Sequence, residues 1–134
     1  MYLFDTDIIT NLLKKQPAAK LLARLEGLEQ RRQYISTITV SEIVYGAYKS
    51  SRPQYHLENL QKILLPSVNI VVFDSKAAYV CGQLRAELER LGTPLSLADL
   101  EIAGISLANG FTLVSGNLRH FSRIPGIKVE NWLV

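Results

Sequence analysis

Four side chains with oxygen donors stand where the chain leaves a predicted strand or begins a predicted helix: Asp5, Glu42, Asp99 and Asn117. Each also has a local explanation, as a helix cap or a turn residue. Because the carboxyl ends of parallel strands meet at one edge of a sheet, these side chains are expected to gather there. Carboxylates gathered without neutralising lysines repel one another, and oxygen donors favour Mg²⁺ or Mn²⁺ over Zn²⁺. The pattern therefore predicts a Mg²⁺-type carboxylate site on an α/β sheet, which is typical of enzymes that act on phosphate esters.

Asp5 follows the apolar run Tyr2-Leu3-Phe4, whose lack of alternation fits a strand buried on both faces. Apolar residues at helical spacing come next, at positions 8, 9, 12 and 13. We therefore expect Asp5 at the end of a central strand and just before a helix, where ligands bind in open α/β sheets. Asp7 is expected to be the N-cap of that helix, and a supporting role in a site is the alternative.

Glu42 and Asp99 each lie three residues after a residue that can cap a helix. Thr39 and Glu42 form one predicted capping box, and Ser96 gives Asp99 the same position. Capping alone is enough to explain both acids, and a site role is the alternative. Gly46 lies one turn after Glu42, where it either leaves room for a ligand or allows tight helix packing.

Helix and strand signals alternate along the chain, which indicates the α/β class. Strands are predicted over residues 2–4, 34–37, 68–73, 111–115 and 128–130. Apolar stripes predict helices within residues 8–13, 18–31, 40–47, 53–66, 75–91, 96–108 and 119–123. The expected fold is a three-layer α/β/α arrangement with a mostly parallel central sheet of about five strands, forming one domain over residues 1–134.

Composition places the chain among ordinary globular proteins. Apolar residues make up 48% and charged residues 20% of the sequence, so disorder is not expected. Since no charged and apolar leader opens the chain and no apolar run reaches about 18 residues, neither secretion nor a membrane span is expected. The single cysteine, Cys81, excludes an internal disulfide and fits a buried thiol in a reducing cytoplasm. The net charge of +3 permits a nucleic-acid partner without arguing for one.

Signatures of other kinds of active site are missing from the sequence. His56 and His120 are far apart and lack metal-ligand spacing. There is no P-loop, no GxGxxG motif and no Ser/His/Asp arrangement. The carboxylate site is therefore the one chemical hypothesis that the residues support.

A series of motifs gives this chain a specific resemblance to a known family. The motifs are Leu3-Phe4-Asp5-Thr6-Asp7, Thr39-Val40-Ser41-Glu42-Ile43 with Tyr45-Gly46, Ala98-Asp99-Leu100-Glu101-Ile102-Ala103, and Thr112-Leu113-Val114-Ser115-Gly116-Asn117-Leu118-Arg119-His120-Phe121. With the tail from Arg123 to Trp132, they cover nearly the whole chain in order. In this series the chain resembles PIN-domain ribonucleases, and among them the VapC-type toxins of type II toxin–antitoxin systems.

The resemblance implies a PIN-like fold and Mg²⁺-dependent cleavage of RNA, with Mn²⁺ able to substitute. Asp5, Glu42 and Asp99 would be the catalytic acids and metal ligands, and Thr6 and Ser115 would be supporting hydroxyls. The implied reaction is attack of a metal-activated water on a phosphodiester. The resemblance further implies a structured RNA substrate such as tRNA, a VapB-type antitoxin partner, a homodimer and a cytoplasmic location.

The chain departs from the family pattern in its last loop. The family often has a fourth acid at the position of Asn117 or of His120, and neither residue is acidic here. A second metal site therefore stays open, and a catalytically impaired PIN module that acts only by binding is an alternative. A phosphatase of the haloacid dehalogenase type, with Asp5 as nucleophile, is a further alternative, although Ile9 stands where that family has Thr or Val.

Four basic residues lie close in sequence to the segments that carry the predicted site: Lys49, Arg52, Arg119 and Arg123. They are candidates for contact with the RNA backbone, because phosphate neutralisation by Lys and Arg provides most sequence-independent affinity. Solvated surface charge is the alternative.

Overall fold

One five-stranded sheet forms the centre of the molecule. The computed structural model describes all 134 residues. The strands are β1 Tyr2–Phe4, β2 Gln33–Ser36, β3 Asn69–Val71, β4 Thr112–Val114 and β5 Lys128–Glu130. They lie in the order β3-β2-β1-β4-β5, and every neighbouring pair is parallel. The predicted class and strand number are confirmed, with a sheet that is wholly rather than mostly parallel.

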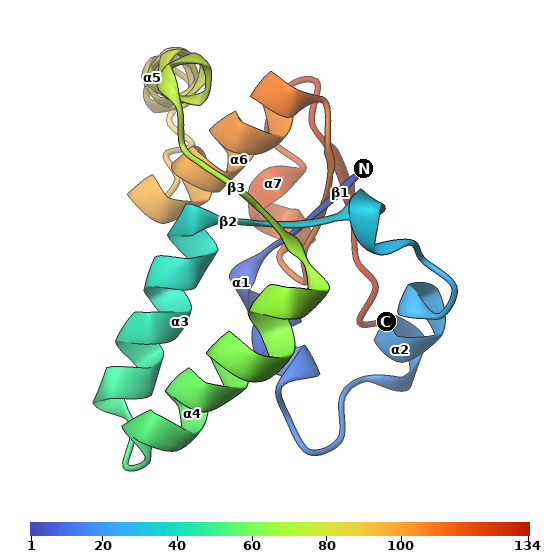
Figure 1. Cartoon of the computed structure of the whole chain (residues 1–134). Coiled ribbons are helices and arrows are strands. Elements are labelled where there is room, and N and C mark those ends of the chain that lie inside the picture. The colour runs from blue at the N-terminus through green and yellow to red at the C-terminus, as the bar shows by residue number, and fades with distance from the viewer.

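Seven helices flank this sheet (Figure 1). They are α1 Thr6–Leu12, α2 Ala19–Leu25, α3 Thr37–Lys49, α4 Pro53–Asn59, α5 Ser75–Arg90, α6 Leu97–Asn109 and α7 Leu118–Phe121. None of them combines the length and the apolar composition that crossing a bilayer requires.

Adjacent residues of each inner strand face opposite layers of the fold. Leu3 and Leu113 pack with α5, α6 and α7, in a cluster that includes Leu84 and Ile105. Phe4 and Val114 pack on the other side, with residues of α1, α2 and the segment after α4. Because helices cover both faces, β1 carries no polar residue, and the central strand predicted from the run Tyr2-Leu3-Phe4 is confirmed.

Several helix boundaries differ from the predicted ones. The helix predicted over 18–31 ends at Leu25, and Gly27 then takes a φ of 76°, which few other residues adopt readily. The helix that starts at Pro53 changes into a π-helical turn over Leu60–Leu64 and a 3₁₀ turn over Leu65–Ser67. Pro66 lacks the N–H that a regular helix would need there. Apolar periodicity continues through such turns, so it did not reveal them.

The helices α5 and α6 pack closely through Gly104. A Cβ atom at this glycine would lie 2.9 Å from the Ala77 carbonyl oxygen and 3.0 Å from Cys81 Cβ. Cys81 is buried as predicted, and burial raises the pKa of its thiol. The close approach of the two helices therefore depends on the missing side chain at position 104.

We expect Gly104→Ala to destabilise the fold by about 1–3 kcal/mol, because overpacking outweighs the gain in helix propensity of about 1 kcal/mol. Gly82→Ala is the matched control: it also lies in a helix interior, but nothing is within 4 Å of its Cβ position. This control should gain up to about 1 kcal/mol. Urea unfolding measures the change in unfolding free energy of each variant. Equal stabilisation of both would contradict the packing argument.

Candidate active site

A hollow of about 520 Å³ opens where β1 and β4 end and α1 begins. Its walls contain all four of the oxygen-bearing residues singled out from the sequence. The lining residues are Asp5, Thr6, Asp7, Thr10, Asn11, Lys14, Glu42, Asp99, Asn117 and Leu133. The structure thus brings together four oxygen-bearing side chains that are up to 112 positions apart in the sequence, at the carboxyl edge of a parallel sheet.

Asp5 is the buried member of this set, with 6% of its surface exposed. It is the N-cap of α1, and its Oδ1 accepts a hydrogen bond of 2.8 Å from the Thr6 backbone N–H. Its Oδ2 accepts a second, of 2.8 Å, from the Ser115 hydroxyl at the end of β4. Ser115 is fully buried and does not line the hollow, so it contributes to the site through its hydrogen bond to Asp5.

Asp7 is not the N-cap of α1, so that prediction was wrong. Because β1 passes into the helix with no intervening loop, Asp5 takes the cap position and Asp7 falls in the first turn. Asp7 Oδ2 instead accepts a hydrogen bond of 2.9 Å from the Gly116 backbone N–H. A Cβ at Gly116 would lie 2.7 Å from that oxygen and 2.9 Å from Leu133 Cδ1, so any larger residue there would displace one or both of these side chains.

Glu42 lies inside α3 rather than in a capping box with Thr39. The N-cap of α3 is Ser36, whose Oγ accepts a hydrogen bond of 3.1 Å from the Thr39 N–H. Thr39 is therefore buried in the first turn, and Glu42 is exposed a turn later. Glu42 Oε1 accepts a hydrogen bond of 2.6 Å from the Thr6 hydroxyl, which joins α3 to α1.

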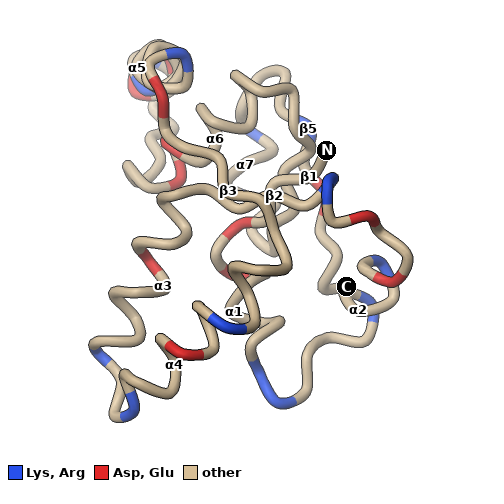
Figure 2. Tube along the Cα trace, in the orientation of Figure 1, with Lys and Arg blue, Asp and Glu red and all other residues tan.

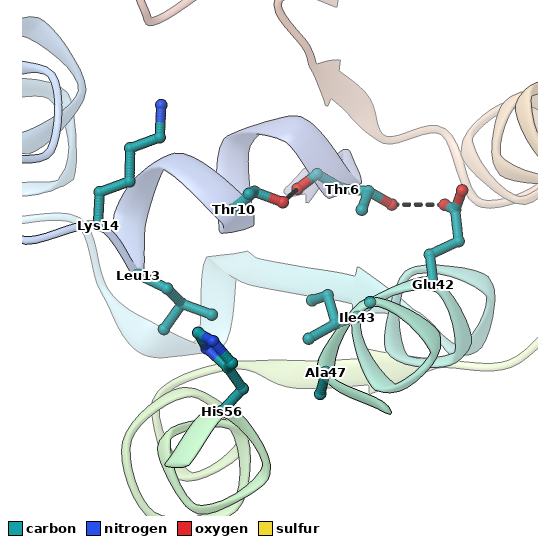
Figure 3. A pocket seen from close by; sticks show the side chains of 9 residues that line it. Thr6, Thr10, Leu13, Lys14, Glu42, Ile43, Ala47 and His56 are labelled. Atoms are coloured by element: carbon teal, nitrogen blue, oxygen red, sulfur yellow. Dashed lines mark hydrogen bonds between the residues drawn. The ribbon is translucent and has the colours of Figure 1, made fainter. Parts of the chain in front are cut away.

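A second hollow, of about 400 Å³, lies between α1, α3 and α4 (Figure 3). It shares four lining residues with the first, namely Thr6, Thr10, Lys14 and Glu42. Gly46 lines it, and nothing is within 4 Å of the position that a Cβ there would take. Of the two explanations for Gly46, tight helix packing is therefore wrong. The glycine leaves open space next to Glu42.

Asp99 lies in the first turn of α6, where Ser96 is the N-cap and accepts a hydrogen bond of 3.2 Å from the Asp99 N–H. The predicted cap is confirmed. Asp99 Oδ2 lies 3.5 Å from His120 Nδ1, and the same ring nitrogen is 2.8 Å from Asn117 Nδ2. Asp99, His120 and Asn117 therefore form one connected group at the α7 side of the hollow.

Burial and the crowding of negative charge raise the pKa values of Asp5 and Asp7. Burial, together with the charges of Asp7 and Asp99, raises the pKa of Asp5 from 3.8 to about 6, against the lowering effect of its hydrogen bonds from Ser115 and Thr6. Burial is also the main cause of the raised pKa of Asp7, and the charge of Asp99 adds to it. The hollow thus holds more negative charge than its neighbours neutralise.

The donor chemistry of this hollow fits a hard divalent cation. Asp5, Glu42, Asp99 and Asn117 offer carboxylate and amide oxygens, and Lys14 is the one Lys or Arg among the lining residues. In the structure no three His, Cys, Asp or Glu side chains converge to coordination distance of one point. Asp5, Asp7 and Glu42 instead accept hydrogen bonds from protein donors. Burial is the main cause of the raised pKa of Asp5, and the charges of Asp7 and Asp99 add to it.

None of the four predicted RNA-contacting residues lines the hollow. Lys49 Nζ lies 5.4 Å from the centroid of the Tyr45 ring, and the Arg52 guanidinium lies 4.1 Å from that of Tyr55. Figure 2 shows basic positions at this turn between α3 and α4. Arg119 and Arg123 are exposed, in and just after α7.

Lys14 is a site residue that the sequence interpretation missed. It lines both hollows. The signal was present, because Thr6, Thr10 and Lys14 recur every four residues and so share one side of α1 and its extension. The adjacent Lys15 and Pro17 are typical of the end of a helix, so this spacing alone does not distinguish a site residue from a helix terminus.

Comparison with known proteins agrees with this architecture. The family model for the PIN domain matches residues 2–127. The tRNA(fMet)-specific endonuclease VapC of Salmonella typhimurium is 37% identical over 131 residues, which are 98% of this chain and 97% of that protein. Ribonuclease VapC2 of Haemophilus influenzae is 33% identical over 132 residues, which are 98% of each chain.

Solved structures give the same result. The crystal structure of DNA-bound VapBC from Salmonella typhimurium superposes with a TM-score of 0.90 at 37% identity, over 98% of this chain and 97% of that one. VapBC2 from Rickettsia felis, bound to a promoter DNA fragment, also has a TM-score of 0.90, at 34% identity over 98% of both chains.

The chain therefore belongs to the PIN-domain family. Within that family its relatives are the VapC nucleases, as the resemblance implied. The match along nearly the whole chain leaves no support for the haloacid dehalogenase alternative, in which Asp5 would be a nucleophile.

The buried charge of Asp5 predicts a pH-dependent stability. Its folded pKa of about 6 exceeds the ordinary value of 3.8, so the fold binds this proton more tightly than the unfolded chain. The associated stability is fully present below pH 3.8 and is lost as the pH rises through 6, a loss of about 3 kcal/mol at pH 7. Because Asp5→Asn cannot ionise, it should be more stable than the parent at pH 7 by up to about 3 kcal/mol, with little difference near pH 4.

Urea unfolding in metal-free buffer, followed by fluorescence of the buried Trp132, measures this effect at both pH values. Glu26→Gln, at an exposed position, is the control and should show no such pH-dependent gain. A difference between Asp5→Asn and the parent that is the same at pH 4 and pH 7 would contradict the electrostatic assignment.

Proposed function

We propose that this protein, as one PIN domain over residues 1–134, is a Mg²⁺-dependent endoribonuclease and the toxin of a toxin–antitoxin pair. The observation that carries the proposal is the convergence of Asp5, Glu42 and Asp99 on one hollow at the carboxyl edge of the sheet. Their negative charge suits a cation, and the curated relatives of this chain are named as ribonucleases and tRNA endonucleases. Structured RNA, with tRNA first, is therefore the proposed substrate.

Asp5, Glu42 and Asp99 are the proposed ligands of the cation, and Asn117 offers an amide oxygen at the same hollow. When bound, Mg²⁺ supplies Lewis-acid stabilisation of charge on a phosphodiester and lowers the pKa of water, with Mn²⁺ as a substitute. A hollow with unneutralised carboxylates would repel the RNA backbone, so cation binding also makes substrate binding electrostatically favourable.

Thr6 and Ser115 are the proposed supporting hydroxyls, and the contacts of both point to positioning. Ser115 Oγ donates to Asp5 Oδ2 and accepts a hydrogen bond of 2.9 Å from the Asn117 N–H, so it ties the acid to the loop after β4. Thr6 Oγ1 donates to Glu42 and lies 3.1 Å from Thr39 Oγ1. Each hydroxyl therefore fixes the orientation of one carboxylate across two elements of the fold.

The phosphates of the RNA other than the one that is cleaved are proposed to be neutralised by Lys and Arg side chains of the protein. Lys14 stands at the rim of the hollow and is the proposed contact next to the cleaved bond. Lys49, Arg52, Arg119 and Arg123 do not line the hollow, and we propose that they contact the backbone farther along the RNA.

The proposed partner is a VapB-type antitoxin, because several solved relatives are VapBC complexes, among them two bound to DNA. The toxin itself is proposed to form a homodimer. Action on tRNA would take place in the cytoplasm.

Asp5→Asn and Asp99→Asn should each lower RNA cleavage at least about a hundredfold, because each removes charge from the cation site. Glu26→Gln removes the same charge from the surface and should cleave like the parent. EDTA should abolish cleavage, and added Mg²⁺ or Mn²⁺ should restore it. The measurement is gel analysis of purified tRNA incubated with each purified protein. Full cleavage by Asp99→Asn, or cleavage in EDTA, would refute the proposal.

Expression of the protein without a partner should arrest bacterial growth, and Asp5→Asn should relieve the arrest at equal protein level. Co-expression of a short neighbouring gene that encodes an antitoxin should restore growth of the parent strain. Growth curves with immunoblotting for protein level measure both effects. Normal growth with abundant, folded and metal-binding protein would favour the alternative, a catalytically impaired PIN module that acts by binding.

A further inference from the structure

The hollow between α1, α3 and α4 has a lining unlike that of the candidate active site. Its volume of about 400 Å³ falls within the range of pockets that bind small organic groups. Ile43 and Ala47 of α3 face Leu13, just after α1, and the ring of His56 on α4 (Figure 3). This hollow therefore offers apolar and aromatic surface, whereas oxygen donors dominate the active-site hollow.

His56 presents an exposed aromatic ring that has no polar partner in the protein. Its side chain makes no hydrogen bond and no ion pair, whereas His120 makes one of each. The Tyr55 ring packs against it in a T-shaped arrangement, with 5.3 Å between the ring centroids. Histidine is one of the aromatic side chains on which unstacked RNA bases stack. The His56 ring is therefore a stacking surface at the wall of the hollow.

The two hollows are continuous through the four residues that line both, namely Thr6, Thr10, Lys14 and Glu42. In RNA the sugar joins each base to its phosphate, so a base next to the cleaved bond lies within one nucleotide of the active-site hollow. Lys14, at the junction, carries the positive charge that suits the phosphate of such a nucleotide. An apolar peptide side chain in the same space would have no charge for Lys14 to neutralise, so the arrangement favours RNA.

Thr10 and Gly46 make this space suitable for the edge and the bulk of a base. The Thr10 hydroxyl donates a hydrogen bond of 2.8 Å to the Thr6 carbonyl oxygen, which leaves its own lone pairs to accept a base N–H. Nothing lies within 4 Å of the position that a Cβ at Gly46 would take, so the hollow is open there. Bases of loops and bulges, which are not paired, are the ones that turn out into such a space.

We propose that the hollow between α1, α3 and α4 binds one unpaired nucleobase of the RNA, next to the phosphodiester that is cleaved. The base stacks on the His56 ring and contacts Leu13 and Ile43, and Lys14 binds the phosphate of the same nucleotide. This inference rests on the RNA cleavage proposed above and adds a second subsite to it. The subsite restricts cleavage to unpaired segments, such as the loops of a tRNA.

Filling the hollow from Gly46 tests the subsite. Gly46→Leu should not destabilise the fold, since nothing lies within 4 Å of its Cβ position and leucine favours a helix. It should lower kcat/KM for tRNA at least about tenfold, the effect of losing one stacked base, while Mn²⁺ affinity measured by electron paramagnetic resonance stays the same. Gly82→Leu makes the same change at an open position in α5 and should cleave like the parent.

Replacement of His56 tests the stacking contact. His56→Ala removes the ring and should lower kcat/KM for tRNA about fivefold. His56→Phe keeps a flat ring without its nitrogens and should recover most of that loss. An equal loss in the two variants would overturn the inference.

Removal of the base itself is the decisive test. A synthetic RNA stem-loop that contains the mapped cleavage site is prepared with an abasic nucleotide on either side of the cleaved bond. At one of these positions the parent should lose about tenfold in kcat/KM. Gly46→Leu should show no further loss there, because its side chain already fills the hollow. Equal losses in the parent and in Gly46→Leu would overturn the inference.

These measurements separate the subsite from the proposed function. If the parent cleaves tRNA and Gly46→Leu cleaves it equally well, the inference is overturned and the function stands. If Gly46→Leu cleaves normally but no longer binds the co-expressed antitoxin, the hollow belongs to the protein partner and the inference is overturned. If the parent cleaves no RNA, both are overturned.

Discussion

The buried carboxylate of Asp5 at the end of β1 is the constraint on which the site depends. An ionised acid with 6% exposure is tolerated only where donors reach both of its oxygens. Those donors come from the Thr6 N–H in α1 and the Ser115 hydroxyl after β4. The strand order meets this requirement, because β4 lies next to β1 and its end supplies the hydroxyl. On the other side of β1, β2 leads into α3, which carries Glu42.

Hydrogen bonds orient these acids but do not remove their mutual repulsion. Asp5 and Asp7 both have raised pKa values, and the charge of Asp99 contributes to each. A protein selected for stability alone would replace such a group by neutral residues, since a buried charge without a partner opposes folding. The presence of these acids at an open hollow therefore argues for a role that needs the charge.

The features that the sequence predicted correctly are those set by neighbouring residues. The strand 2–4 and the cap at Ser96 each depend on a few adjacent positions. The features that it missed depend on pairing between distant segments. Parallel pairing with β3 ends β2 at Ser36, so the cap falls there and not at Thr39, and the contact of Asp7 with Gly116 spans 109 residues.

Asp99 and Glu42 lie at different distances from the starts of their helices, and this difference affects how their charges are stabilised. In α6 the carboxylate of Asp99 lies in the first turn, where the helix dipole favours negative charge. Glu42 lies a turn deeper in α3, beyond most of that effect, and is held by the Thr6 hydroxyl instead. Helix starts therefore offset part of the charge of Asp99 and of Asp5, the N-cap of α1, but not that of Glu42. Lys14 is the one protein cation that lines the hollow with these acids, and their oxygen donors are of the kind that suits a divalent ion.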